Sequence, residues 1–170
     1  VSPDFLSTFD KNPLLAKKLN AKTGVTTGDN NKHVLFWYEV ERNNINFNAK
    51  NRKDTLEFPQ KWYPLNSGGK FKKWYGNNEN IIEWKNDGEI IRSRKNSNIR
   101  NQKYFFKEGL TWGKITSANL SVRYSPPGFM FDAVGLMAFP KNENFHNVLA
   151  LLNSKIVRLY SKAFNPTLSI

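Results

Sequence analysis

The middle of the chain is a succession of short apolar runs separated by turn-forming residues, and this pattern constrains the fold more than any other feature. The runs lie at residues 81–84, 104–106, 110–112, 120–124 and 129–131. Runs this short, rich in β-branched and aromatic residues and bounded by Gly, Asn or Pro, are typical of strands joined by turns. Residues 34–40 have the same character and follow a turn-rich loop at 24–31. We therefore expect a sheet-rich centre.

Helical signals are confined to the two ends of the sequence. Ser2 and Pro3 are typical of a helix start, and apolar residues at roughly helical spacing predict two short helices that end before Lys22. Near the other end, Asn144 can cap a helix whose apolar stripe runs through residues 145–160 until Pro166 stops it. This stripe is expected to pack on the sheet.

These elements predict an α+β fold: a twisted, mostly antiparallel sheet or partial barrel flanked by N- and C-terminal helices. The polar stretch 41–54 is expected to be an exposed connection. We expect residues 1–170 to form a single domain, because 170 residues with 39% hydrophobic content can build one core. The chain starts with Val1 and is expected to be a fragment of a longer protein.

The charge of the chain indicates a polyanionic partner. Lys and Arg exceed Asp and Glu by 26 to 14, a net charge of +12, and residues 61–123 alone hold 13 basic against 5 acidic residues. Phosphate neutralisation would supply sequence-independent affinity for nucleic acid. Aromatic residues alternate with these cations and suit stacking on bases, although each ring is more often part of a sheet core.

Other partners and locations are less consistent with this composition. The basic residues do not form the amphipathic helix that binds a membrane surface, and no run of eighteen apolar residues occurs. The sequence has no cysteine and no pattern typical of a signal peptide, which fits a cytoplasmic protein.

The segment 61–76 contains the most unusual motif. Gly68 and Gly69 can form a flexible turn whose amides approach a phosphate, with Lys70, Lys72 and Lys73 as flanking charges. The alternative is an ordinary Gly-Gly turn with solvated lysines.

Several catalytic motifs are incomplete. The loop 24–31 lacks the Gly-Lys-Ser/Thr ending of a phosphate-binding loop. Residues 125–129 read Ser-Pro-Pro-Gly-Phe, where amino-methyltransferases have an aromatic residue directly after the two prolines, and no Gly-rich S-adenosylmethionine loop precedes them. His33 and His146 are expected at the surface or in a cap, because no Cys or spaced carboxylate pair accompanies them. The chain is therefore expected to be non-catalytic.

One enzymatic alternative remains open. Glu83 and Lys85 match the Glu-x-Lys end of a Mg²⁺-dependent nuclease site, for which Asp54 would be the upstream carboxylate. A basic module that binds acidic proteins is a further alternative.

The ordered motifs resemble a known family over residues 24–168. They read Thr-Gly-Asp-Asn-Asn (27–31), Phe-Trp-Tyr-Glu-Val (36–40), Lys-Trp-Tyr-Pro (61–64), Lys-Lys-Trp-Tyr-Gly-Asn (72–77), Glu-Trp-Lys-Asn-Asp-Gly (83–88), residues 104–112, Arg-Tyr-Ser-Pro-Pro-Gly-Phe (123–129), Leu-Leu-Asn-Ser-Lys (151–155) and Asn-Pro-Thr (165–167). Their order and spacing are similar to the region after the catalytic domain in PglX-type adenine-specific DNA methyltransferases of BREX phage-exclusion systems, and in related fused restriction-modification enzymes.

The resemblance implies a division of labour. In that family an N-terminal domain binds S-adenosylmethionine and methylates adenine N6, while the downstream region recognises the DNA target. The chain lacks the first part, so double-stranded DNA and the catalytic methyltransferase domain of the same parent protein are its implied partners, and S-adenosylmethionine is implied only for the parent.

The expected DNA contacts fall into two groups. Cations that would hold the DNA backbone are Lys61, Lys70, Lys72, Lys73, Arg92, Arg94, Lys95, Arg100, Lys103 and Lys114. Side chains that would read base edges are Asn30, Asn31, Arg94 and Arg123. Arg123 could equally form a buried ion pair, and the run 92–95 could be an exposed loop.

Overall fold

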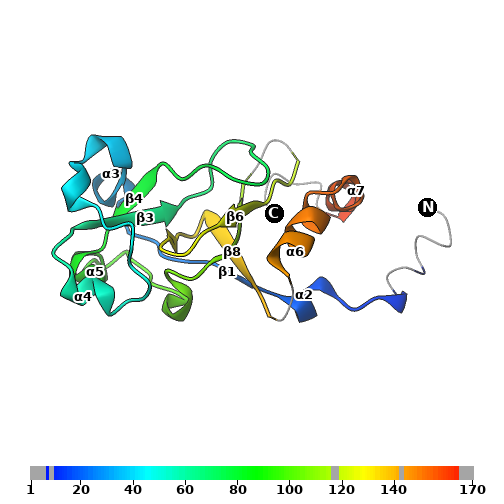
Figure 1. Cartoon of the computed structure of the whole chain (residues 1–170), viewed down its shortest axis with the longest axis horizontal. Coiled ribbons are helices and arrows are strands. Elements are labelled where there is room, and N and C mark those ends of the chain that lie inside the picture. The colour runs from blue at the N-terminus through cyan, green and yellow to red at the C-terminus, as the bar shows by residue number, and fades with distance from the viewer. Residues whose placement is uncertain (1–6, 8–9, 116–118, 142–143, 165–170) are drawn as a thin grey trace.

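The computed structural model describes residues 7, 10–115, 119–141 and 144–164, and builds them around two four-stranded sheets (Figure 1). The first sheet is antiparallel throughout, in the order β1 (Leu19–Lys22), β8 (Gly135–Pro140), β5 (Gly109–Gly113) and β6 (Arg123–Ser125). The second has the order β2 (Val34–Phe36), β4 (Asn80–Glu83), β3 (Trp62–Asn66) and β7 (Met130–Phe131), of which only β3 and β7 are parallel. The α+β prediction is confirmed, with open sheets and no closed barrel.

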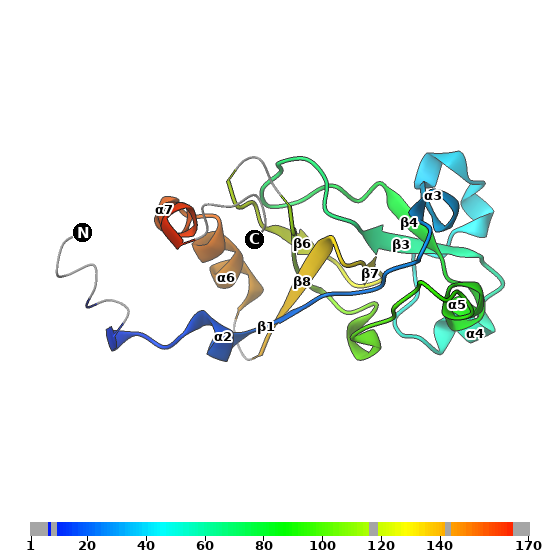
Figure 2. The ribbon, with the colours of Figure 1, turned by 180° about the vertical axis from the view of Figure 1, so that it is seen from behind.

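The helices are short and gather at opposite ends of the molecule (Figures 1 and 2). At one end lie α2 (Leu15–Lys18), α6 (Phe145–Leu152) and α7 (Lys155–Phe164), and at the other α3 (Asn30–His33), α4 (Asp54–Glu57) and α5 (Lys85–Arg92). Three 3₁₀ turns connect strands among the described residues: η1 (Trp37–Glu39), η2 (Arg42–Asn44) and η3 (Gln102–Tyr104).

The segment that follows β1 ties the two sheets together. The backbone amides of Gly24 and Val25 donate to the carbonyl oxygens of Asp132 and Phe131, each over 3.0 Å, alongside β7. A Cβ on Gly24 would lie 1.7 Å from the Phe131 oxygen, so only glycine fits at this position. The loop at residues 24–31, which lacks the ending of a phosphate-binding loop, is thus bonded to the segment of β7 through Gly24 and Val25.

Aromatic residues dominate the main core cluster. Trp84 packs edge to face on Phe105 with ring centroids 5.6 Å apart, and Phe105 packs in the same way on Phe131 at 5.5 Å. Tyr63 and Phe106 form a third such pair at 5.9 Å. Edge-to-face pairs of this kind contribute beyond the area they bury. Most aromatic rings of residues 61–123 therefore pack in the core, as the sequence predicted for each ring taken alone.

A second core cluster lies between the first sheet and α6. Val148, Leu149 and Leu152 of α6 are buried against Leu110 and Val122. The expected packing of the C-terminal helix on the sheet is confirmed for this segment. The Asn144 cap is confirmed as well, because its Oδ1 accepts a hydrogen bond from the His146 amide over 2.8 Å.

The predicted single C-terminal helix is wrong, because it divides at Asn153. The Asn153 side chain pairs with the backbone of Val122: Oδ1 accepts from the amide over 3.1 Å, and Nδ2 donates to the carbonyl over 2.8 Å. Beyond this junction, Ile156 and Leu159 of α7 are 59% and 64% exposed, so they do not continue the core-facing stripe.

The other element predictions have mixed outcomes. Strands within residues 81–84, 110–112, 120–124 and 129–131 are confirmed, with shifted ends. The predicted strand at 104–106 is wrong: Tyr104 ends η3, and Phe105 and Phe106 enter the core on irregular backbone, with φ of 67° at Phe106. The strand at 34–40 ends at Phe36, and β1 occupies positions expected to be helical.

Several elements were not predicted, among them β3, β8 and α5, and two predicted helix ends cannot be compared. β3 and β8 carry buried backbone with little alternation, and α5 contains three consecutive left-handed residues, Asn86, Asp87 and Gly88. Asn, Asp and Gly are the residues that tolerate this conformation best. The stretch 41–54 is only partly exposed, since Ile45 and Ala49 are buried. The predicted helix start at Ser2 and Pro3 and the predicted helix end at Pro166 lie outside the described residues.

Candidate nucleic-acid interface

The Gly68-Gly69 turn forms, and a buried arginine supports it from below. Gly68 and Gly69 have φ of 72° and 107°, in the region that favours glycine. The Arg123 Nη2 donates to the Gly68 carbonyl over 3.2 Å, and Asn77 Nδ2 donates to the Lys70 carbonyl over 2.8 Å. The loop is therefore held in one shape by side chains beneath it.

Only one of the three lysines predicted on this loop has its ammonium unpaired among the described residues. Lys73 Nζ donates to the Asn153 carbonyl over 2.9 Å, and so ties the loop to the α6–α7 junction. Lys72 Nζ lies 3.6 Å from the Glu79 carboxylate. Lys70 is exposed and makes no such contact. The loop thus presents less free positive charge than its sequence indicates.

Arg123 does not lie where a base reader would. It is 2% exposed, its Nη2 faces Gly68, and burial lowers its pKa, an effect that the Glu79 charge opposes. A guanidinium in this position positions the loop and does not face solvent.

The arginines of the run 92–95 are mostly engaged within the chain. Arg92 Nη2 lies 2.8 Å from the Asp87 carboxylate and 2.8 Å from Gln102 Oε1, and Arg94 Nη2 lies 3.3 Å from Asp29. Lys95, Arg100 and Lys114 are exposed and form no ion pair with a described residue.

Asn30 and Asn31 lie exposed in α3, whose first turn the Asp29 side chain caps. Asn30 Oδ1 accepts a hydrogen bond from the Thr27 hydroxyl over 2.6 Å, which fixes its orientation. Because Arg94 binds Asp29, the structure brings three predicted base readers, Asn30, Asn31 and Arg94, to one loop.

A hollow lined by cations lies between the turn before α4 and the turn η3. Its volume is about 510 Å³, and we call it the basic hollow; its lining residues are Lys50, Asn51, Arg52, Lys53, Gln102, Lys103, Phe105 and Lys107. Among these lining residues, only Lys103 was predicted to contact DNA. The other four cations were missed because they lie in two segments about fifty residues apart that folding brings together.

The backbone of the basic hollow is held rigidly. Asn51 Oδ1 accepts from the Lys53 amide over 2.8 Å, and Asp54 Oδ2 accepts from the Lys50 amide over 2.6 Å. Arg52 binds the Asp87 carboxylate through two nitrogens, one of them Nε at 3.0 Å. The lysine side chains project from a backbone that is already ordered.

Tyr104 gathers further positive charge beside the hollow. The ammonium groups of Lys103, Lys107 and Lys22 lie 5.4, 5.8 and 5.9 Å from the centre of its ring. The ring stacks on Phe139 with centroids 4.6 Å apart, so its position is fixed by the core. Cation–π attraction offsets part of the mutual repulsion of these lysines.

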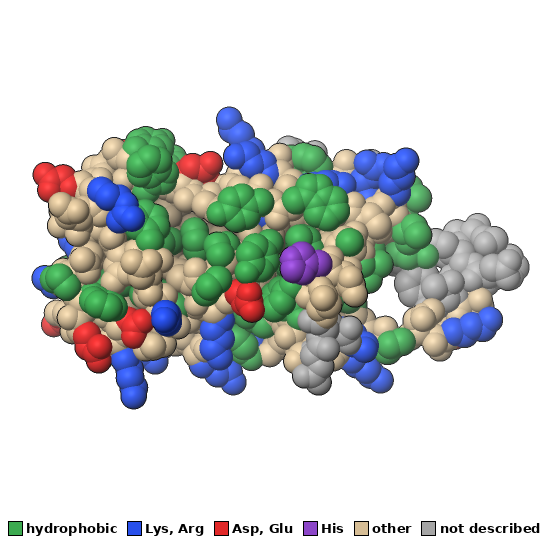
Figure 3. All heavy atoms as spheres, viewed as in Figure 1, with side chains coloured by type: hydrophobic (Ala, Val, Ile, Leu, Met, Phe, Trp, Pro, Cys, Tyr) green, Lys and Arg blue, Asp and Glu red, His purple; other side chains and the backbone are tan. Residues whose placement is uncertain are grey.

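Ion pairs compensate the positive charge of this region only in part. Asp87 pairs with Arg52, but Lys50, Lys53, Lys103 and Lys107 form no ion pair among the described residues. Figure 3 shows Lys and Arg side chains projecting along the lower edge of the molecule, below α4 and the neighbouring turn. Like charges held this close favour a bound anion.

The predicted nuclease residues do not form an open metal site. Glu83 is 5% exposed; His33 Nδ1 lies 2.9 Å and Lys61 Nζ 3.1 Å from its two oxygens. Burial alone would raise the Glu83 pKa, but the hydrogen bonds from His33 and Lys61 leave it below its ordinary value. Lys85 is exposed at the start of α5, and no group of three or more His, Asp or Glu suited to a metal occurs among the described residues.

The contacts of Glu83 change what the sequence predicted for His33 and Lys61. His33, expected at the surface or in a cap, is fully buried against Glu83. Lys61, expected to hold the DNA backbone, neutralises the buried carboxylate while its side chain stays 49% exposed. An apolar run of β4 with an acidic residue at its end could have indicated that Glu83 needs a buried partner.

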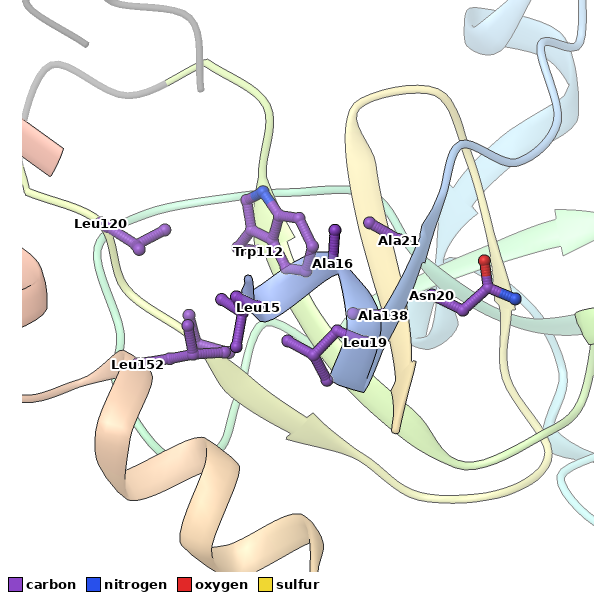
Figure 4. Close-up of a pocket in the computed structure, with 10 residues that line it drawn as sticks. Leu15, Ala16, Leu19, Asn20, Ala21, Trp112, Leu120, Ala138 and Leu152 are labelled. Carbon is purple, nitrogen blue, oxygen red and sulfur yellow. The ribbon is translucent and has the colours of Figure 1, made fainter. Parts of the chain in front are cut away.

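A second hollow is apolar and unsuited to phosphate. Figure 4 shows Leu15, Leu19, Trp112, Leu120 and Leu152 turned toward a groove of about 570 Å³ between α2, the first sheet and α6. None of its lining residues is charged. The two hollows therefore differ in chemistry and lie toward different ends of the molecule.

Comparison with known proteins identifies the relatives of this chain. No family model matches it. It is 39% identical over 161 residues to the adenine-specific methyltransferase PglX of Lacticaseibacillus casei (strain Zhang), which covers 88% of this chain. It is 35% identical over 169 residues, 97% of this chain, to the adenine-specific methyltransferase BrxX of Escherichia coli O9:H4 (strain HS).

This chain is homologous to a segment of the PglX-type adenine-specific methyltransferases. The resemblance drawn from the ordered motifs is thereby confirmed. The chain spans 13% of the length of each of these two PglX-type relatives, so it corresponds to a small part of them.

No helix among the described ranges has the length and apolar character that crossing a bilayer requires.

Proposed function

We propose that this chain binds duplex DNA as the target-recognition part of an adenine-specific DNA methyltransferase, and that the basic hollow holds the DNA backbone. The carrying observation is the set of five cations that line one hollow, of which only Arg52 is paired with a carboxylate among the described residues. Homology to adenine-specific methyltransferases makes DNA the polyanion that fits best.

The proposed mechanism separates positioning from reading. Lys50, Lys53, Lys103 and Lys107 neutralise successive phosphates and set the register of the duplex. Asn30 and Asn31 lie exposed beside Arg94, and an asparagine amide can pair with the adenine edge in the major groove while arginine can pair with guanine. The loop of Asn30 and Asn31 is thus the proposed base-reading element.

Methyl transfer belongs to another part of the proposed enzyme. The backbone at Gly24 is packed against Phe131, which leaves no space for a methyl donor at this glycine. On this proposal the catalytic domain of the same protein binds the methyl donor and acts on the adenine that this chain selects. The biological setting that we propose is phage defence in the cytoplasm.

The test compares lysine pairs in the complete protein that carries this sequence. Lys50→Gln with Lys53→Gln, and separately Lys103→Gln with Lys107→Gln, should each weaken binding to a duplex on the order of tenfold at low salt, because phosphate contacts are lost. The control pair is Lys17→Gln with Lys155→Gln, which removes the same charge from exposed residues of α2 and α7.

The outcomes separate the proposal from its alternatives. Equal loss of affinity in the control pair would show that only net charge matters and would overturn the assignment to the basic hollow. Binding to an acidic protein without affinity for duplex DNA would favour the protein-interaction alternative. Mg²⁺-dependent cleavage that Glu83→Ala abolishes would favour the nuclease.

A further inference from the structure

An exposed hollow lined by aromatic rings lies on the second sheet, apart from the basic hollow. Its volume is about 400 Å³, and we call it the aromatic hollow; its lining residues are Trp37, Arg42, Phe47, Tyr75, Asn78 and Phe129. They come from the start of η1, from the turn η2 and the stretch after it, from the loop before β4, and from the residue just before β7. Three parts of the chain that are distant in sequence, residues 37–47, residues 75–78 and Phe129, therefore meet around one open space.

Two rings of this hollow, Trp37 and Phe47, pack on neighbouring rings of the chain. The Trp37 amide donates to the Glu79 carbonyl over 2.9 Å, and Tyr38 packs edge to face on the Trp37 ring at 5.7 Å. Phe47 packs on the small core of Ile45, Trp62 and Ile81. A preorganised site loses little conformational entropy on binding.

The rings are also unusually exposed for their size. Trp37 is 46% and Tyr75 60% exposed, although large aromatic side chains are generally well buried. Exposed aromatic faces that line one hollow are typical of surfaces that stack on flat ligands.

Polar groups in the hollow suit the edge of such a ligand. The Arg42 guanidinium lies 4.2 Å from the centre of the Phe47 ring and donates through Nη1 to the Ile45 carbonyl over 3.3 Å. Arg42 forms no ion pair with a described residue, so its remaining N–H groups are available. Asn78 adds an amide that can both donate and accept.

We propose that the aromatic hollow receives a single nucleobase that is unpaired in, or displaced from, the duplex. The inference rests on the proposed DNA-binding function and names the part of the DNA that this second site takes. Trp37 and Tyr75 stack on the faces of the base, and Arg42 and Asn78 contact its edge. Lys70, exposed on the same loop as Tyr75, adds a positive charge to that loop.

The aromatic rings and the polar groups of the hollow together favour a nucleobase over an apolar protein side chain. A leucine or phenylalanine would leave the Arg42 guanidinium and the Asn78 amide without partners, whereas each base has acceptors along its edge. Stacking on aromatic side chains is also tolerant of base identity. This site would therefore add affinity for an extruded base with little sequence preference.

The experiment compares two duplexes that differ by one base. One carries a single unpaired adenine in a central bulge, and the other carries the same bulged nucleotide without its base. The complete protein should bind the first roughly fivefold or more tightly, the range that one stacked base contributes. Trp37→Ala and Tyr75→Ala should each abolish this preference while binding of the base-free duplex stays unchanged.

The matched control is Phe71→Ala, an exposed aromatic residue on the same loop as Tyr75 that does not line the hollow. It should retain the preference for the bulged adenine. Equal affinity of the unaltered protein for both duplexes, or a preference that survives Tyr75→Ala, would overturn the inference and leave the proposed DNA binding intact. Absence of binding to either duplex would instead overturn the proposed function, and the inference with it.

Discussion

Several basic side chains that were predicted to contact DNA instead contact groups within the chain. Arg92 binds Asp87, Lys61 binds Glu83 and Arg123 lies beneath Gly68, although each was predicted to contact DNA. Sequence supplies the charge of a side chain but not its direction, because direction depends on contacts made by residues far apart in the chain. Lys103 needs no such correction, since it lies where other cations gather.

The Glu83 cluster makes a prediction about acid stability. The Glu83 pKa is lowered below its ordinary value of 4.5, so its contribution is complete above that value and is lost as the pH falls through the lowered folded pKa. Glu83→Gln should reduce the free energy of unfolding by about 1–3 kcal/mol near neutral pH. Urea unfolding at several pH values should show this difference shrinking below pH 4.5.

Glu57→Gln provides the control, because Glu57 is exposed in α4 and makes no described side-chain contact. This change should leave the free energy of unfolding nearly unchanged at every pH. A difference between Glu83→Gln and the unaltered protein that stays constant down to about pH 3, well below the ordinary Glu83 pKa of 4.5, would contradict the account.

At the scale of the element, strands were predictable where apolar runs are compact, and boundaries were not. β4 and β5 follow from their β-branched and aromatic residues, but the run 104–106 enters the core without forming a strand. An apolar run that is buried need not form a strand. A turn such as η3 can also place its aromatic rings in the core. The division between α6 and α7 depends on the amide of Asn153, which pairs with a distant segment.

The α6–α7 junction yields the prediction for this scale. Asn153→Ala would leave the Val122 amide without its partner, at a cost of about 1–3 kcal/mol for a buried unsatisfied group, while the Val122 carbonyl would still accept from the Trp74 amide over 3.0 Å. Thermal unfolding should show a clear loss of stability. Asn147→Ala, an exposed position of α6, serves as the control, and equal effects of the two changes would contradict the proposed role of the junction.

For the whole molecule, composition indicated the class of partner while folding determined the surface. The net charge of +12 indicated a polyanion, and the clustering in residues 61–123 indicated the central segment. The basic hollow instead combines Lys50, Arg52 and Lys53 with Lys103 and Lys107, so three of its five cations lie outside that segment. The aromatic hollow could not be predicted from the sequence either, because its rings come from separate segments.

The most direct measurement of the central claim is the salt dependence of duplex binding by the complete protein. The logarithm of the association constant should fall linearly with the logarithm of the salt concentration. The slope should become shallower by about two when Lys103 and Lys107 are both replaced by Gln, since each phosphate contact contributes about 0.9. The Lys17→Gln with Lys155→Gln pair should keep the original slope. No binding at low salt, or identical slopes in all three proteins, would contradict DNA binding through the basic hollow.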